Sequence, residues 1–144
     1  MNQTISRDIL TVTHGVIVQQ VNCQGVMGAG LAKQIADKWP RVKEEYLEIC
    51  NRAVKPPLGF YKLTRINEGL SVASVFGQDG YERKGCHTNY MALIGGLKHL
   101  HAYTKNLKGE TIYSMYIPHG IGCGLAGGDW HVVSALIEQE LPVN

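Results

Sequence analysis

Residues 21–34 read VNCQGVMGAGLAKQ, and this stretch decides the fold. Three glycines, Gly25, Gly28 and Gly30, follow the apolar run 15–22 and precede a segment with helical spacing. Glycine costs conformational entropy on folding, so it suits places where the backbone turns sharply or comes close to another group. Between a strand and a helix, that group is most often a phosphate. The stretch therefore predicts a strand, an anion-binding loop and a helix.

Length and composition indicate one ordinary domain, residues 1–144, with 44% hydrophobic residues to form its core. A net charge of +2, from 14 basic and 12 acidic residues, argues against a nucleic-acid groove or a membrane surface. The four cysteines lack the CxxC spacing of a zinc site or a disulfide framework. We therefore expect a cytoplasmic protein with reduced thiols and without a metal or cofactor, whose oligomeric state the sequence leaves open.

Strand and helix patterns alternate along the chain, which predicts an α/β sandwich with a mixed, largely parallel central sheet. Strands are expected at 15–22, 59–66, 70–76 and 111–118, and helices at 28–39, 40–53, 89–100 and 130–141. Residues 77–87 have the composition of a loop, and Asp129 is placed to cap the last helix.

The two glycine clusters do not fit two common nucleotide-binding patterns. Gly25 and Gly30 match the glycines of a GxxxxGK[ST] loop, but Leu31 and Ala32 replace its lysine and hydroxyl, which excludes that chemistry. The second cluster contains a GxGxxG pattern that begins at Gly122. A Rossmann domain needs a further strand and an acidic residue after it, for which the sequence has no room. An NAD-binding Rossmann domain therefore remains only an alternative.

A third interpretation takes the two clusters together. Each cluster follows a predicted strand and precedes a predicted helix, so both loops can meet at one edge of the sheet. Their backbone N–H groups and the two helix N-termini would then hold a diphosphate without any lysine. This arrangement predicts a ligand such as ADP-ribose, which has a diphosphate between two sugars.

The stretches 21–34 (VNCQGVMGAGLAKQ) and 117–130 (IPHGIGCGLAGGDW) together resemble the macrodomain family, whose members bind ADP-ribose. The similarity runs from Asp8 to the last helix. It is greatest to phage and bacterial members near the terminal ADP-ribose glycohydrolases and ADP-ribose-1''-phosphate phosphatases. The resemblance implies a three-layer α/β/α sandwich that binds ADP-ribose or an ADP-ribosylated substrate and hydrolyses a substituent from the distal ribose. It implies no membrane partner, and nucleic acid only where this carries ADP-ribose; a non-catalytic ADP-ribose-binding module is the alternative.

The resemblance also assigns roles to residues. Asp8 would accept a hydrogen bond from the adenine amino group, with the Ile9 amide beside it, and Asn22 would contact the distal ribose. Two walls would hold the diphosphate: Gly28, Ala29, Gly30 and Leu31 on one side, and Ile121, Gly122, Cys123, Gly124, Leu125 and Ala126 on the other. Without a ligand, Asp8 would be a turn residue and Asn22 would bond nearby backbone.

Two features depart from the family. The glycohydrolases use a lysine after the strand that corresponds to 70–76 and an acid after GCGL, but here FGQDG follows the strand and Ala126 follows GCGL. Asp129, Asn22 and Gln78 remain as candidates for the chemistry, with Asp129 or a ligand phosphate activating a water, although Asp129 can equally be only a helix cap. The family also ends on a strand that the sequence does not match after ELPVN, so we expect weaker adenine stacking or partial dimerisation.

Overall fold

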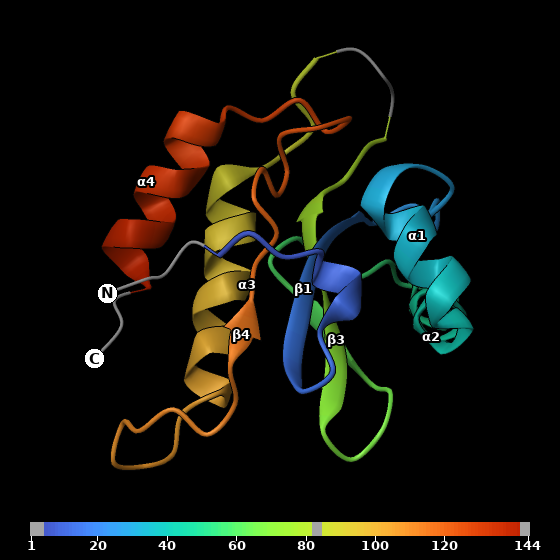
Figure 1. Ribbon diagram of the computed structural model, residues 1–144. Coiled ribbons are helices and arrows are strands. Elements are labelled where there is room, and N and C mark those ends of the chain that lie inside the picture. Colours follow the sequence, from blue (N-terminus) through green and yellow to red (C-terminus); the bar gives the residue numbers. More distant parts are fainter. Residues whose placement is uncertain (1–4, 82–84, 142–144) are drawn as a thin grey trace.

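The computed structural model describes residues 5–81 and 85–141 (Figure 1). A short 3₁₀ helix, Ile9–Thr11, precedes the first strand. The strands are β1 (Gly15–Asn22), β2 (Tyr61–Arg65), β3 (Leu70–Gln78) and β4 (Met115–Tyr116), and the helices are α1 (Gly30–Lys38), α2 (Pro40–Cys50), α3 (Tyr90–Tyr103) and α4 (Trp130–Glu140). Every predicted strand and helix is present in the predicted order.

The sheet is mixed and largely parallel, as predicted. Its strand order is β2-β3-β1-β4, in which β1 pairs in parallel with both β3 and β4, while β2 pairs antiparallel with β3. β1 is almost continuously buried, which is typical of a parallel strand covered on both faces. β1 therefore lies at the centre of the molecule, and the residues at its carboxyl end are held firmly.

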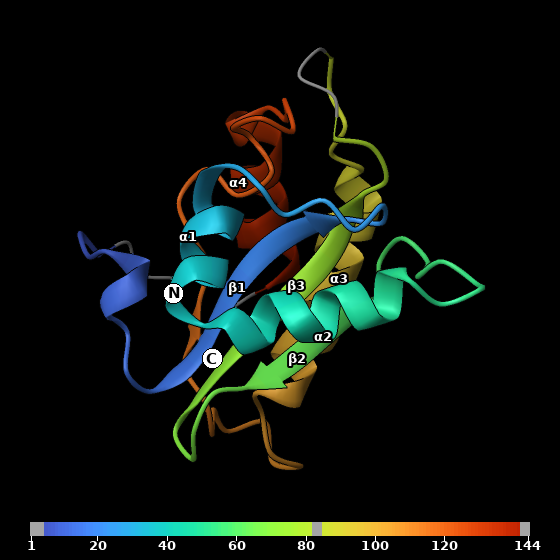
Figure 2. The ribbon, with the colours of Figure 1, turned by 90° about the vertical axis from the view of Figure 1, so that its right-hand side faces the viewer.

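Helices cover both faces of the sheet, so the predicted three-layer sandwich is confirmed. α1 and α2 lie on one face and α3 and α4 on the other (Figures 1 and 2). Successive residues of β1 serve the two layers in turn. Val16 and Val18 pack in the core cluster that contains Leu97 of α3, whereas Ile17 packs with Ile35 of α1.

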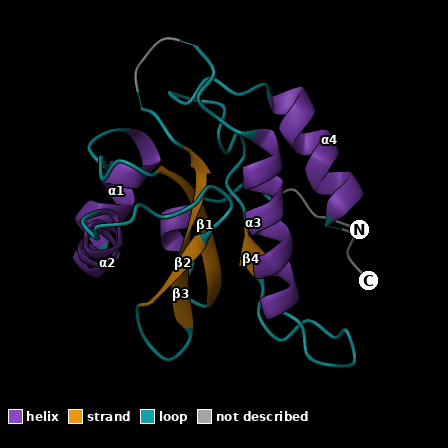
Figure 3. Ribbon diagram, turned by 180° about the vertical axis from the view of Figure 1, so that it is seen from behind, coloured by secondary structure: helices purple, strands orange, loops and turns teal. Residues whose placement is uncertain are grey.

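Several predicted boundaries were wrong. α1 begins at Gly30 rather than Gly28, which leaves Gly28 in the loop, and β3 continues to Gln78. β4 contains only two residues instead of the predicted 111–118. The amide of Ile112 donates to the carbonyl of Thr104 at 2.8 Å, so this segment turns back onto the end of α3 before β4 begins. Seen from behind, β4 lies beside α3 at the edge of the sheet (Figure 3).

Local signals in the sequence explain several element boundaries. Pro40 occupies the start of α2, where a missing N–H is harmless. The Asn67 side chain accepts hydrogen bonds from the amides of Gly69 and Leu70 at 2.9 and 3.0 Å and forms the β2–β3 turn. None of the helices in residues 5–81 and 85–141 combines the length and apolar character that crossing a bilayer requires. The segment after Leu141, where the final strand was unmatched, lies outside the described residues.

Candidate functional site

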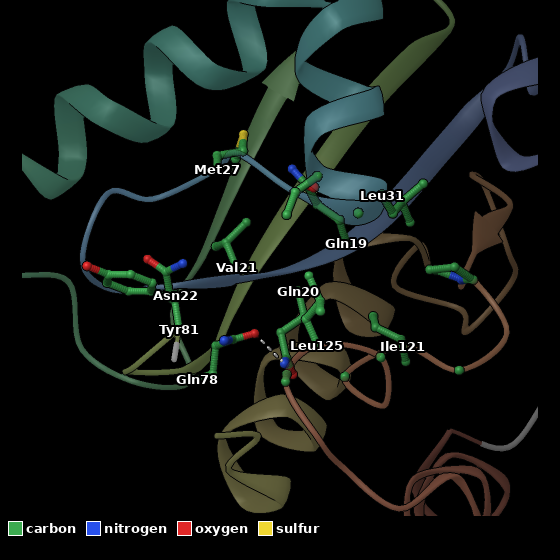
Figure 4. Close-up of a pocket in the computed structure, with 18 of the residues that line it drawn as sticks. Gln19, Gln20, Val21, Asn22, Met27, Leu31, Gln78, Tyr81, Ile121 and Leu125 are labelled. Carbon is green, nitrogen blue, oxygen red and sulfur yellow. Dashed lines mark hydrogen bonds between the residues drawn. The ribbon is translucent and has the colours of Figure 1, made fainter. Parts of the chain in front are cut away.

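The connections after β1 and β4 open a crevice at the carboxyl edge of the sheet. β1 and β4 are parallel neighbours, but the chain passes from β1 to α1 on one face and from β4 to α4 on the other. In α/β sheets, ligands usually bind in the crevice between two adjacent strands whose connections leave toward opposite faces. The cavity there has a volume of about 680 Å³ (Figure 4).

Four segments line this crevice: the end of β1, the loop that leads into α1 with the first residues of that helix, the end of β3 with Tyr81 beyond it, and the segment after β4. Its lining residues are Gln19, Gln20, Val21, Asn22, Val26, Met27, Gly28, Ala29, Gly30, Leu31, Ala32, Gln78, Tyr81, Pro118, His119, Gly120, Ile121, Gly122, Gly124, Leu125 and Ala126. The structure therefore brings the two predicted walls together. Among the residues predicted to touch a ligand, Asp8, Ile9 and Cys123 are not part of this lining.

The first wall presents free backbone N–H groups. Gly30 has a φ of +61°, a left-handed conformation that favours glycine, and α1 starts there. The residue before it, Ala29, gives α1 no side-chain cap. Among the described residues, no acceptor bonds the amides of Gly28 through Ala32. The N-terminus of α1 is thus open toward the crevice, as anion binding requires.

The second wall alternates between occupied and free amides. The amides of Ile121 and Cys123 close turns on the carbonyls of Pro118 and Gly120, at 3.1 and 2.8 Å. The amides of Gly122, Gly124, Leu125 and Ala126 have no acceptor in the described part of the chain. Free donors therefore lie on both sides of the same crevice.

Main-chain dipoles, rather than charged side chains, give the crevice its polarity. The residues that line it in the described structure include no Asp, Glu, Lys or Arg. The amide groups and the open N-terminus of α1 attract negative charge. A Cβ atom at either Gly28 or Gly124 would meet nothing within 4 Å, so both glycines border open space. This geometry suits an elongated anion with several oxygen acceptors.

The N-terminus of α4 is closed, which corrects the prediction that both helix N-termini face the ligand. The Asp129 carboxylate caps α4 by accepting from the His131 amide at 2.8 Å, and the Asp129 amide donates to the Tyr90 hydroxyl at 2.9 Å. Asp129 is not among the residues that line the crevice. Burial, followed by the negative charge of nearby Asp129, raises the pKa of the Cys123 thiol in the second wall.

Asn22 organises the loop that follows β1. Its Oδ1 accepts from the amides of Gln24 and Val26 at 3.0 and 3.3 Å, and its Nδ2 donates to the Val26 carbonyl at 2.7 Å. The buried Tyr46 hydroxyl donates to the carbonyl and Oδ1 of Asn22, both at 2.8 Å. The predicted backbone-bonding role of Asn22 is confirmed, and a contact with the distal ribose stays a prediction.

Asp8 and Ile9 lie away from this lining. Asp8 accepts from the Leu10 amide at 2.9 Å and caps the 3₁₀ helix. Ile9 lines a second groove of about 770 Å³, and His119 lines both this groove and the crevice. The His119 ring packs against Trp130, with ring centroids 4.6 Å apart. The adenine contact of Asp8 therefore stays a prediction.

The cysteines are free thiols. Burial, followed by the nearby Asp79 charge, raises the pKa of Cys23 to about 11, so this thiol stays protonated and inert. Within the described residues, no three His, Cys, Asp or Glu side chains come together as metal ligands. Lys84 follows the strand 70–76 at too great a distance to match the glycohydrolase lysine by position, and it lies outside the described residues.

Gln78, which the sequence named as a candidate for the chemistry, lines the crevice. Sequence reasoning missed three polar side chains that also line it: Gln19, Gln20 and Tyr81. Gln19 and Gln20 interrupt the apolar strand GVIVQQVN, and two polar residues in a buried strand are a usable signal.

No protein-family model matches the chain. The chain is 29% identical to a DNA ADP-ribosyl transferase–DNA ADP-ribosyl glycohydrolase fusion protein from Thermosipho africanus, over 85% of this chain and 36% of that protein. The chain thus spans about a third of the fusion protein. It is 24% identical to an ADP-ribose 1''-phosphate phosphatase from Saccharomyces cerevisiae, over 86% of this chain and 82% of that protein.

Solved structures share the whole fold. A Bacteroides thetaiotaomicron protein of unknown function matches with a TM-score of 0.80 and 27% identity, over 94% of this chain and 87% of that one. The macrodomain of Mycobacterium tuberculosis DarG matches with a TM-score of 0.73 and 22% identity, over 95% of this chain and 89% of that one. The chain has the macrodomain fold.

The family resemblance predicted from the two glycine-rich stretches is therefore confirmed. α4 is the last helix described, and in the described residues no strand follows the GxGxxG pattern. Thermosipho africanus DarTG, solved in complex with ADP-ribose, shares the fold with a TM-score of 0.70 and 23% identity, over 89% of this chain and 35% of that one.

Proposed function

We propose that this macrodomain binds ADP-ribose with the diphosphate between the two walls of the crevice and hydrolyses a substituent from the distal ribose. The observation that carries the proposal is the pair of loops with free amides that line the crevice, Gly28–Ala32 on one side and Gly122 with Gly124–Ala126 on the other. A diphosphate offers acceptor oxygens to both loops at once, and the partial positive charge of the α1 N-terminus adds to the attraction.

The two activities named for the curated relatives, a DNA ADP-ribosyl glycohydrolase and an ADP-ribose 1''-phosphate phosphatase, both remove a group from ADP-ribose, and this supports the hydrolytic part. In this proposal the crevice positions the distal ribose so that a water meets its anomeric carbon or its attached phosphate. Asp129, or an oxygen of the bound diphosphate, takes the proton of that water. Asn22 holds the loop beneath the ribose.

A non-catalytic ADP-ribose-binding module is the second candidate, and one observation favours it. The side chains of Asp129 and Asn22 both make hydrogen bonds that stabilise local structure: Asp129 caps α4, and the Asn22 carboxamide holds the loop after β1. Among the described residues that line the crevice, none is an acid. In either case we propose a cytoplasmic protein.

Calorimetry with ADP-ribose, and with NAD as the paired control, tests the binding proposal. We expect micromolar binding of ADP-ribose and much weaker binding of NAD. Binding of neither ligand would refute it. Release of phosphate from ADP-ribose-1''-phosphate, or of ADP-ribose from modified DNA, then tests hydrolysis. Turnover that Asp129→Ala abolishes while binding is retained supports the enzyme. Binding without release from either substrate supports the module.

A further inference from the structure

A network of side-chain hydrogen bonds connects β1 and β3 to the second wall of the crevice. Gln20 of β1 donates from Nε2 to the Gln78 Oε1 at 2.9 Å and to the Thr88 hydroxyl at 3.0 Å. The Thr88 hydroxyl donates in turn to the carbonyl of Gly122 at 2.5 Å. Gln78 donates from Nε2 to the Gly80 carbonyl at 2.7 Å. Figure 4 shows Gln20 and Gln78 joined across the end of the crevice.

The direction of every bond in this network is fixed. The carbonyls of Gly80 and Gly122 can only accept, so the Gln78 amide and the Thr88 hydroxyl must donate to them. Thr88 has one hydroxyl proton, which it gives to Gly122, and it therefore accepts from Gln20. Both Nε2 protons of Gln20 are then assigned, and its orientation follows from the network.

Two glycines leave the space that the Gln20 side chain occupies. A Cβ atom at Gly77 would lie 2.4 Å from the Gln20 Oε1, and one at Gly122 would lie 3.0 Å from both this oxygen and the Thr88 hydroxyl. Gly122 also has a φ of +75°, which L side chains rarely adopt. The Gln20 Oε1 is buried and finds no partner among the described residues.

The Gly122 carbonyl is where the hydrogen-bond network meets the second wall of the crevice. It accepts from the Thr88 hydroxyl and also from the Gly128 amide at 2.9 Å, and neither Thr88 nor Gly128 is among the described residues that line the crevice. A carbonyl turned toward a diphosphate would repel its oxygens, whereas the neighbouring free amides attract them. The Ala126 carbonyl, which accepts from the amides of His87 and Thr88, ties the other end of the wall to the same segment.

We propose that Gln20 and Thr88 are positioning residues for the anion-binding wall: they hold the Gly122 carbonyl so that the free amides of Gly122 and Gly124–Ala126 face the ligand. This inference rests on the proposed function for the identity of the ligand. Gln20 acts through Thr88, and Thr88 acts through Gly122; neither residue is assigned a contact with the ligand.

Paired threonine variants test the proposal. Thr88→Val removes the hydroxyl and keeps the shape, whereas Thr88→Ser keeps the hydroxyl. Thr64→Val is the matched control, because the buried Thr64 hydroxyl of β2 has no partner in the described structure. We expect Thr88→Val to bind ADP-ribose about tenfold more weakly by calorimetry, with Thr88→Ser and Thr64→Val within about threefold of the parent protein. Folded Thr88→Val with parental affinity would overturn the proposal.

A second measurement needs no ligand. The Gly128 amide donates to the same Gly122 carbonyl, so hydrogen exchange at Gly128 reports whether that carbonyl is held. Exchange should accelerate in Thr88→Val and Gln20→Glu, since the glutamate would draw the Thr88 proton away from Gly122, but not in Thr88→Ser. Unchanged exchange in both variants would refute the positioning role. If the parent protein failed to bind ADP-ribose, the proposed function would fall, while exchange would still decide this inference.

Discussion

Replacement of Gly124 with glutamate tests whether the crevice is an anion site. A Cβ atom at this position would meet nothing within 4 Å, and the φ of Gly124 lies outside the left-handed region. The backbone can therefore carry any side chain there without strain. Because Gly124 lines the crevice, a side chain added at this position enters the space that the ligand would occupy. A loss of binding in this variant would thus reflect the site and not the fold.

The magnitude follows from Coulomb's law. A carboxylate about 4 Å from one phosphate charge costs about 4 kcal/mol at an effective dielectric constant of about 20, the value typical of a protein surface. That energy corresponds to roughly a thousandfold loss of affinity. Salt screens exposed charges over about 10 Å at 0.1 M, so the loss should shrink as salt is added.

Calorimetry with ADP-ribose on Gly124→Ala, Gly124→Gln and Gly124→Glu separates size from charge. Alanine should stay within about threefold of the parent protein, because open space surrounds its methyl group. Glutamine measures the steric loss, and glutamate should bind more weakly again, with a gap that narrows in high salt. If the folded glutamate variant bound as tightly as the alanine variant, the crevice would not be the anion site.

Three further predictions concern stability. Asp129→Ala should lower the free energy of unfolding by about 1 kcal/mol through loss of the α4 cap, and Asp129→Asn should restore most of it in denaturant titration. Tyr46→Phe should lower the free energy of unfolding by about 1–3 kcal/mol, because the Asn22 carbonyl loses its hydroxyl donor and the Gly25 amide loses its acceptor; an unchanged melting temperature would contradict this. Burial, aided by the Lys105 charge, lowers the pKa of His101, so the unfolded chain binds more protons below about pH 6.5 and stability falls as the pH drops. His101→Gln should flatten that fall in thermal melts at several pH values, and His99→Gln on the same helix should not.

Much of the fold could be predicted because local chemistry and tertiary packing agree. Pro40 begins α2, Asn67 forms the hairpin turn, and Asp129 caps α4, each as its residue type predicts. β4 was predicted too long because the segment 111–118 has strand composition throughout. Which of its residues pair depends on the hydrogen bond from Ile112 to Thr104, and that contact has no signature in the local sequence.

The two glycine-rich walls of the candidate site could be predicted from the sequence. The hydrogen-bonded side chains that support the second wall could not. The positions of Gly28 and Gly124 revealed both walls. Composition could not reveal that α4 is closed by its own cap, since Asp129 is equally consistent with a cap and with a catalytic acid. The chain from Gln20 through Thr88 joins residues that are 68 apart in sequence, so only the folded structure brings it to light.

A site built from peptide N–H groups tolerates evolutionary drift unusually well. Every residue except proline supplies the same donor, so side chains along the two walls can change while the donors remain. Selection then acts on the path of the backbone, through glycines such as Gly30 and Gly122 and the contacts that hold them. Two such domains can lose most of their sequence identity and still present the same row of donors to a ligand.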